Sequence, residues 1–234
     1  MLCEKLKRLE DDRSLAHSWI KNRSRLDVLA QIRQNSLRKA EERGCRYYFV
    51  ADCDNLILPH TLRDMVACQK PIVAPLLHCV GNENLSNFVM AALKTPASNA
   101  MQERKIRMKE RGIFPAMLVH NTYLVDVRYA SKLSYEGRDG SFEFTNFSIS
   151  AKKNGVNQYV CNKRFYGFFL HFWNTVENEA RLIRDHGPVL QDILDAMIDE
   201  EVETVYSLLN RVSVSNVGWM KRADPKEMLI STLV

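Results

Sequence analysis

An alternation of amphipathic and apolar segments between residues 25 and 77 is the feature that most constrains the fold. The first segment, "RLDVLAQIRQNSLRKAEERG" (25–44), predicts a helix. Its apolar face is expected to consist of Leu26, Leu29, Ile32 and Leu37. The strand "CRYYFVA" (45–51), a helix over 59–69 and the strand "PIVAPLL" (71–77) follow. Helix, strand, helix, strand is typical of α/β proteins, so we expect a mainly parallel sheet.

The rest of the chain continues this pattern less regularly. Further elements are predicted as loops with one or two short pieces within 82–111, paired strands within 112–127, a helix over 141–155 capped by Ser141, and a strand over 157–162. From Trp173 onward, leucine and isoleucine recur at helical spacing. We therefore expect an α/β domain over residues 1–172 and a helical C-terminal extension over residues 173–234.

Composition and charge limit the partners that we expect. The chain has 234 residues, of which 46% are hydrophobic, a share that is ordinary for globular proteins with a substantial core. Its net charge is +5. This charge is too weakly basic to indicate a nucleic-acid partner. The basic residues are scattered, for example in "MQERKIRMKERG" (101–112), which favours a solvated face over a patch that binds phosphate or an acidic partner. The six cysteines lack the spacing of a zinc site. We also expect no signal peptide and no transmembrane segment, since the start is charged and the apolar stretches are short.

Two carboxylates, Asp52 and Asp54, follow the first predicted strand in "FVADCDNLILP" (49–59). Residues i and i+2 of an extended segment point the same way, here at the strand end where α/β sheets bind ligands. Carboxylate oxygens are preferred ligands of Mg²⁺ and Mn²⁺, and such an ion bridges to a nucleotide diphosphate. An acid-x-acid triplet also arises by chance, and an Asp-Asn turn is ordinary. The residues alone therefore leave both a metal–nucleotide site and a simple turn open.

Four stretches in a fixed order carry a resemblance to a known family. They are "YYFVADCDNLILPHTLRDMV" (47–66), "LSNF" (85–88), "LVHNTYLVDVR" (118–128) and "YVCNKRFYGF" (159–168). Over residues 23–168 the chain resembles the first glycosyltransferase domain of the procollagen galactosyltransferases. The resemblance implies a GT-A fold, a nucleotide-binding α/β sandwich with Mn²⁺ as cofactor. It also implies transfer of galactose from a UDP-sugar donor, UDP-galactose, to hydroxylysine of a collagen-like protein in the endoplasmic reticulum lumen, and it leaves a homo-oligomer open.

The resemblance also assigns site residues by position. Asp52 and Asp54 are implied to hold the metal and the UDP diphosphate, and Asn55 to support their turn. Asn87, in "LSNF", is implied to line the donor-binding cleft. Glu143 is implied to be a general base or an acceptor-orienting group beside the attacking hydroxyl.

Three departures from the family pattern weaken these assignments. The family shows two adjacent acids where this chain has Glu143 and Phe144. Trp173 stands where a histidine ligand is expected, so the nearby His171 becomes the candidate third metal ligand. The segment before Trp19 is too short for the donor-binding start, so we expect an N-terminally truncated GT-A-like domain. An alternative hypothesis is therefore a catalytically degenerate domain that serves as an interaction module.

Several other residues are expected to have structural roles. His120 ends an apolar strand, where a hydrogen-bonded structural histidine is favoured over a ligand. Aromatic residues are expected in the core rather than on a sugar-stacking surface: Tyr47, Tyr48, Tyr123, Phe165 and Tyr166.

Overall fold

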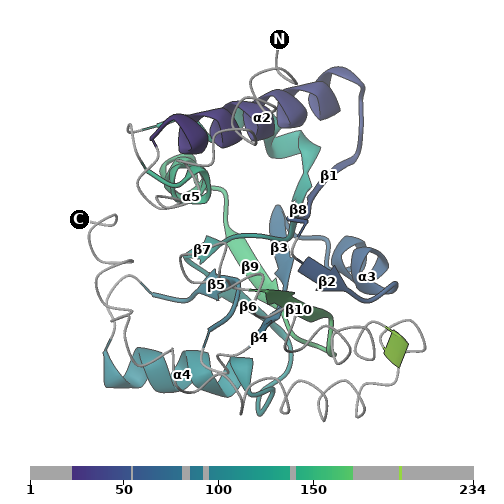
Figure 1. The fold of residues 1–234 in the computed structure, drawn as a ribbon, viewed down its shortest axis with the longest axis vertical. Helices are drawn as coiled ribbons and strands as arrows, with labels where there is room; N and C mark the ends of the chain where they lie inside the picture. Colours follow the sequence, from purple (N-terminus) through teal and green to yellow (C-terminus); the bar gives the residue numbers. More distant parts are fainter. Residues whose placement is uncertain are drawn as a thin grey trace, which may run out of the picture.

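The computed structural model describes residues 23–53, 55–80, 85–91, 95–137, 141–170 and 195–196. The helices are α2 (Arg23–Glu42), α3 (Thr61–Ala67), α4 (Pro96–Ile106), α5 (Glu143–Lys153) and the 3₁₀ helix η2 (Val127–Lys132). The strands are β1 (Tyr47–Val50), β2 (Asn55–Ile57), β3 (Ile72–Pro75), β4 (His78–Val80), β5 (Phe88–Val89), β6 (Ile113–Ala116), β7 (Leu118–Val119), β8 (Tyr123–Asp126), β9 (Gln158–Cys161) and β10 (Gly167–Leu170), labelled in Figure 1. Asp54, His171 and, apart from residues 195–196, the predicted helical extension lie outside these residues.

The central sheet is mixed, with the strand order β1-β8-β3-β9-β6. β3 and β9 pair in parallel, whereas β8 pairs antiparallel with both β1 and β3, and β6 pairs antiparallel with β9. The expectation of a mainly parallel sheet is therefore wrong. β1 and β3 do run in the same direction, as the alternation of helices and strands predicts. However, β8 comes from much later in the chain and lies between them, which a local pattern does not encode.

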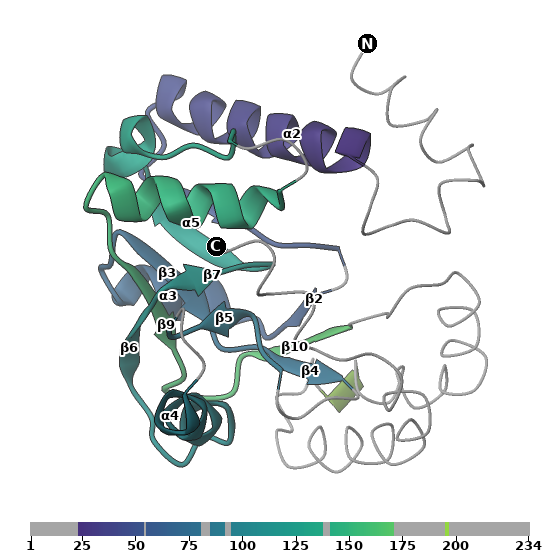
Figure 2. The same ribbon diagram turned by 90° about the vertical axis from the view of Figure 1, so that its left-hand side faces the viewer.

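Helices cover both faces of the central sheet and give the domain three layers. Successive residues of a strand point to opposite faces. Accordingly, Ile72 and Ala74 of β3 join the apolar cluster under α2 and α5, while Val73 joins the cluster under α3. Figure 2 shows α2 and α5 side by side over one face of the sheet. The helix α3 packs on β3 and β8 from the other face.

Two helices begin differently from the sequence prediction. The segment expected to be mostly loop contains α4, which starts with a capping box: the Thr95 hydroxyl accepts from Ser98 N, and the Ser98 hydroxyl accepts from Thr95 N. The predicted Ser141 cap of α5 is wrong, because Phe142 occupies the N-cap position and makes no side-chain capping bond. The predicted stop is confirmed, since Gly155 follows α5 with a φ of 67°.

A second, three-stranded sheet with the order β2-β10-β4 holds the segment that follows the carboxylate turn. β10 pairs antiparallel with β2, so that Gly167 lies opposite Ile57. Gly167 has a φ of 130°, and a Cβ atom at this position would lie 2.0 Å from the carbonyl oxygen of Leu56. Glycine alone permits this approach. The pairing that fixes β2 therefore depends on a residue more than a hundred positions later.

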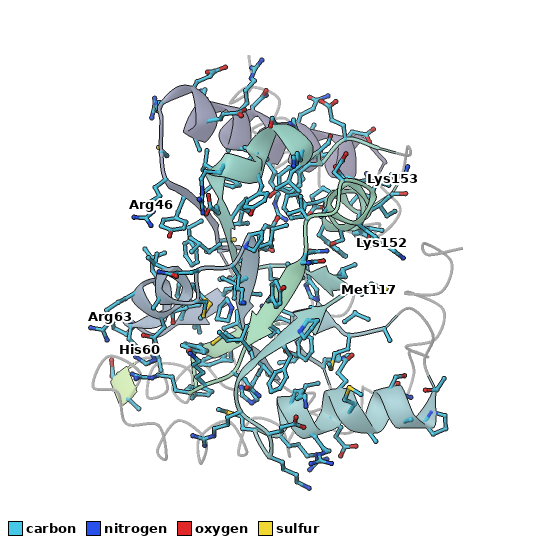
Figure 3. The ribbon with its side chains drawn as sticks, turned by 180° about the vertical axis from the view of Figure 1, so that it is seen from behind. Arg46, His60, Arg63, Met117, Lys152 and Lys153 are labelled. Atoms are coloured by element: carbon cyan, nitrogen blue, oxygen red, sulfur yellow. The ribbon has the colours of Figure 1, made fainter. Side chains whose placement is uncertain are left out.

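Most basic side chains lie on the surface, on separate elements. Figure 3 shows Arg46 and Arg63 on one side of the molecule and Lys152 and Lys153 at the end of α5 on the other. Lys105 is an exception within the predicted solvated face, because it is 3% exposed. Among the described helices, none has the length and apolar character that crossing a bilayer requires.

Candidate functional site

Arg33 of α2 brings together two carboxylates from distant parts of the chain. Its Nη2 forms an ion pair with Oδ1 of Asp52, and its Nη1 lies 2.7 Å from Oε1 of Glu143. The side chains of Arg33 and Glu143 are 7% and 4% exposed, whereas that of Asp52 is 31% exposed. The three charges therefore form one cluster, which reaches the surface at Asp52.

Local structure fixes the position of each carboxylate. Asp52 follows the end of β1, and its backbone N–H donates to the carbonyl oxygen of Asn121, 3.2 Å away, just before β8 begins. Glu143 is the first residue of α5, where the helix dipole favours a negative charge. The site thus lies at the carboxyl end of β1, the end at which α/β sheets bind ligands.

Arg33 occupies a core position of its helix. The buried residues of α2 include Leu26, Arg33 and Leu37, and the half-buried Ala30 packs against the apolar cluster that contains Leu37. Leu29 and Ile32, which we expected on this face, are only half-buried. The sequence prediction overlooked Arg33, although a charge at the helical spacing of a buried stripe was the signal that could have identified it. A buried arginine requires compensating negative charge, which Asp52 and Glu143 supply.

The surroundings of Arg33 keep it charged. Burial lowers the pKa of its guanidinium, but Tyr123, Glu143 and Asp52 outweigh burial and raise this pKa above its ordinary value. The hydroxyl of Tyr123 lies 2.7 Å from that of Tyr135, and both side chains are fully buried. Burial raises the pKa of both tyrosines, so each hydroxyl stays neutral at physiological pH.

The aromatic residues that we expected in the core mostly lie there. Tyr123, Phe165 and Tyr166 are buried, and the half-buried Tyr47 and Tyr48 pack against the two apolar clusters. A different set of rings lies beside the charged cluster, and it starts at His120.

His120 links the charged cluster to a row of half-buried rings. Its Nδ1 donates to Oδ1 of Asn121 at 2.6 Å, as expected for a hydrogen-bonded structural histidine. Burial lowers the pKa of His120, and the neighbouring Asn121 and Asp52 oppose this shift without reversing it. The imidazole lies 5.2 Å from the ring of Phe144, which stacks on Phe142 at the same distance. His120, Phe144 and Phe142 are all partly exposed.

Asn55 offers an oxygen that fits a metal or ligand site. Its Nδ2 donates to the hydroxyl of Thr122 at 2.6 Å, which fixes the amide. Its Oδ1 is buried and accepts no hydrogen bond from the described residues. Together with the carboxylate of Asp52, this amide oxygen is the hard type of donor that suits Mn²⁺. Asp54 and His171 lie outside the described residues and stay predicted ligands.

Asn87 lies beneath the site as a buried connection between strands. Its Oδ1 accepts from Leu77 N at 2.9 Å, and its Nδ2 donates to the carbonyl oxygens of Pro75 and Thr122 at 2.9 and 3.4 Å. The side chain is completely buried. Asn87 thus joins the end of β3 to the start of β8, and its predicted role in lining the donor cleft stays a prediction.

Comparisons with known proteins place these residues in a family context. Residues 3–185 match the sequence model described as glycosyltransferase family 25, N-terminal domain. Procollagen galactosyltransferase 2 of Mus musculus is 33% identical over 159 residues, 62% of this chain and 24% of the relative. Procollagen galactosyltransferase 1-A of Xenopus laevis is 32% identical over 158 residues, 62% of this chain and 25% of the relative.

A further relative differs in its described activity. Inactive glycosyltransferase 25 family member 3 of Homo sapiens is 27% identical over 238 residues, 92% of this chain and 38% of the relative. The chain spans about a quarter of the length of the two galactosyltransferases named above.

Proposed function

The chain belongs to glycosyltransferase family 25, because it matches the N-terminal domain of that family over residues 3–185, and we propose that it acts as a metal-dependent glycosyltransferase domain. The proposed donor is a UDP-sugar, UDP-galactose, and the proposed acceptor is the hydroxyl of hydroxylysine in a collagen-like protein. The observation that carries the proposal is the cluster of Arg33, Asp52 and Glu143 at the carboxyl end of β1. This is where a nucleotide-binding α/β sheet holds its ligand.

The donor side of the proposed site is built around Asp52. Asp52 and Asp54 would hold Mn²⁺, with Asn55 beside them and His171 as a third ligand. When bound, Mn²⁺ supplies positive charge for the UDP leaving group. Arg33 holds the Asp52 carboxylate in place through its ion pair and adds a second, permanently charged cation near the diphosphate.

Glu143 forms the acceptor side of the proposed site. A general base must come within hydrogen-bonding distance of the hydroxyl that it deprotonates. Glu143 is 3% exposed and its carboxylate pairs with Arg33, so of its two predicted roles we assign it the second, orienting the acceptor, which it does through Arg33 and not by touching the hydroxyl. Its charge fixes the guanidinium that faces Asp52 and thereby couples the acceptor side to the donor side.

The rings of His120, Phe144 and Phe142 supply an apolar surface next to these charges. One face of a pyranose ring consists of C–H groups, which pack on aromatic rings, while its hydroxyls need polar partners. A row of partly exposed rings that ends near Asp52 suits this combination. We assign this row to the transferred sugar.

The proposed acceptor also sets the compartment. Procollagen is a secreted chain, so an enzyme that modifies it before export works in the endoplasmic reticulum lumen. The test is the fate of an epitope-tagged gene product in fractionated cells. Recovery with lumenal markers is the expected result, and recovery with cytosolic proteins would contradict this part of the proposal.

Calorimetric titration of UDP tests the donor site directly. With Mn²⁺ present we expect a micromolar Kd, about −8 kcal/mol, and with EDTA no binding. Asp52→Asn should lose this metal-dependent affinity, whereas Asp27→Asn, on the exposed side of α2, should keep it. UDP release from UDP-galactose in the presence of a hydroxylysine-containing collagen peptide then tests transfer. Equal UDP affinity in the Asp52→Asn chain would contradict the assignment.

Phe144 supports a second candidate function, a degenerate domain that acts as an interaction module. It places a ring against His120 where the family resemblance implies a second acid. Metal-independent or absent UDP binding by a chain shown to be folded would favour this candidate.

A further inference from the structure

A buried pair of thiols lies on the face of the sheet opposite Arg33. Cys68 is the C-cap residue of α3, and Cys161 is the last residue of β9. Both belong to the apolar cluster under α3, and their exposed fractions are 8% and 0%. Both are free cysteines. The two side chains share a hydrogen bond, although they come from distant parts of the chain.

Tyr166 links the same two elements by a separate set of contacts. Its hydroxyl lies 3.4 Å from Sγ of Cys161 and 3.4 Å from Oδ2 of Asp64. Asp64 lies one helical turn before Cys68, and its carbonyl oxygen accepts from Cys68 N at 3.1 Å. The last turn of α3 and the end of β9 are therefore held together through neighbouring residues as well as through the thiols themselves.

The surroundings give the two thiols different reactivities. The hydrogen bond from Cys68, assisted by Tyr166 and Lys163, lowers the pKa of Cys161 in spite of burial. The same hydrogen bond and burial raise the pKa of Cys68. The lowered pKa favours Cys161 as the attacking sulfur, because thiol–disulfide exchange starts from a thiolate.

We propose that Cys68 and Cys161 form a disulfide-forming site that cross-links α3 to β9. The oxidant is a small-molecule disulfide such as oxidised glutathione. The Cys161 thiolate attacks one of its sulfurs, the glutathione S–S bond breaks, and one glutathione thiolate leaves. Cys68 then loses its proton and attacks the Cys161 sulfur, which releases the second glutathione. Two protein thiols become one cystine, and one oxidised glutathione becomes two reduced molecules.

The cross-link would hold α3, the helix that follows β2 along the chain. The start of α3 is already fixed by the carbonyl oxygen of Tyr166, which accepts from Leu58 N at 2.9 Å and from the Thr61 hydroxyl at 3.3 Å. A bond at Cys68 would fix the other end of the same helix. In Figure 3, His60 and Arg63 mark its beginning. This inference does not depend on glycosyl transfer.

Non-reducing peptide mapping of the full chain tests the proposal. The reduced protein is equilibrated in glutathione buffers of increasing oxidant ratio, once in the native state and once during refolding from denaturant. Refolding is included because exchange at two buried sulfurs requires α3 to be unpacked. Free thiols are alkylated before digestion. The exposed Cys45 reports whether the buffer exchanges disulfides at all.

The expected product is a single linked peptide pair that contains Cys68 and Cys161 and has lost two hydrogen atoms. Since the two thiols are already in contact, the link should survive buffers about tenfold more reducing than those that remove glutathione from Cys45. The oxidised chain should have a higher Tm than the reduced chain, and this difference should vanish in Cys68→Ser but persist in Cys45→Ser. Alkylation of both thiols after refolding, with Cys45 glutathionylated, would overturn the proposal. A link from Cys161 to any other cysteine would do the same.

Discussion

Nη1 of Arg33 lies 2.7 Å from Oε1 of Glu143, and both side chains are more than nine-tenths buried. The pair joins α2 to the first residue of α5, two helices that lie side by side over the sheet (Figure 2). Because Arg33 also binds Asp52, this one contact connects the packing of the helices with the geometry of the proposed donor site. Stability and ligand binding should therefore respond together to changes at Arg33.

Arg33→Gln should strongly destabilise the protein. The substitution breaks the ion pair between Arg33 and the buried carboxylate of Glu143, and breaking a buried ion pair costs about 3–5 kcal/mol. Urea denaturation measures the change in the free energy of unfolding. The matched control is Arg38→Gln on the same helix, whose side chain is 63% exposed and which should change stability by less than about 0.5 kcal/mol. A similar small loss of stability in both variants would show that the ion pairs of Arg33 contribute little to the free energy of unfolding.

Removing the charge of Glu143 as well should recover part of this loss. In Arg33→Gln/Glu143→Gln neither buried group is charged, so the double variant should be more stable than the sum of the single changes indicates. A coupling free energy of about 0.5–3 kcal/mol is expected for groups in direct contact. Additive single effects would show instead that Asp52, and not Glu143, is the main partner of Arg33.

The local elements of this fold could be predicted from the sequence better than their arrangement. Periodicity identified α2, β1, α3, β3 and β9, because each of these elements follows its own apolar pattern. The position of β8 between β1 and β3 was not predicted, since it depends on pairs such as Val50 with Tyr123, far apart in the chain. The capping box of α4 is formed by Thr95 and Ser98, but it is hard to predict from the sequence because its third helical position holds Ser in place of the usual Glu or Gln.

The residues of the candidate site also differ in whether the sequence predicts them. Asp52 and Glu143 were selected from the sequence, and the structure brings them together through Arg33. Arg33 itself was not selected, because the apolar face of its helix was assigned through Leu29 and Ile32. The partners of a charge within a buried stripe become known only once the opposite elements are in place.

Asn87→Ala should destabilise the connection between β3 and β8. The change leaves Leu77 N–H and the carbonyl oxygen of Pro75 buried without the partner that Asn87 provides. Each buried polar group that loses its partner costs about 1–3 kcal/mol. Thermal and urea unfolding should both report this loss. Asn99→Ala, at an exposed position of α4, serves as the control and should be neutral within about 0.5 kcal/mol. Equal stability of the two variants would contradict the role of Asn87.

Gly167→Ala should disrupt the pairing of β10 with β2. The added methyl group would lie 2.0 Å from the carbonyl oxygen of Leu56, so the backbone must move. Gly155→Ala is the matched control, because Gly155 also has a positive φ, 67°, but an added Cβ there meets no atom within 4 Å. The control should lose only the conformational cost, about 1–2 kcal/mol. Amide exchange should accelerate in β2 and β10 of Gly167→Ala alone. Unchanged protection there would contradict the predicted clash.

His78 should make the protein less stable as the pH falls. Its Nε2–H donates to the carbonyl oxygen of Ile106 at 3.0 Å, and burial lowers the pKa of the imidazole in the folded state. The unfolded chain therefore binds a proton near pH 6.5, where the folded chain does not yet bind it. Stability is complete above this pH and falls by up to about 1.4 kcal/mol per pH unit as the pH drops towards the lower pKa of the folded state.

His78→Gln separates this titration from other effects of acid. Glutamine retains a donor for Ile106 but does not titrate, so urea unfolding at several pH values should show a shallower loss of stability below about pH 6.5. The pKa of His120 is also lowered in the folded state, and His120 remains in the variant, so part of the dependence of stability on pH should persist. Parallel curves for the two proteins would mean that His78 is protonated equally in the folded and unfolded states. In that case the hydrogen bonds of its ring, which favour the charged form, offset the effect of burial on its pKa.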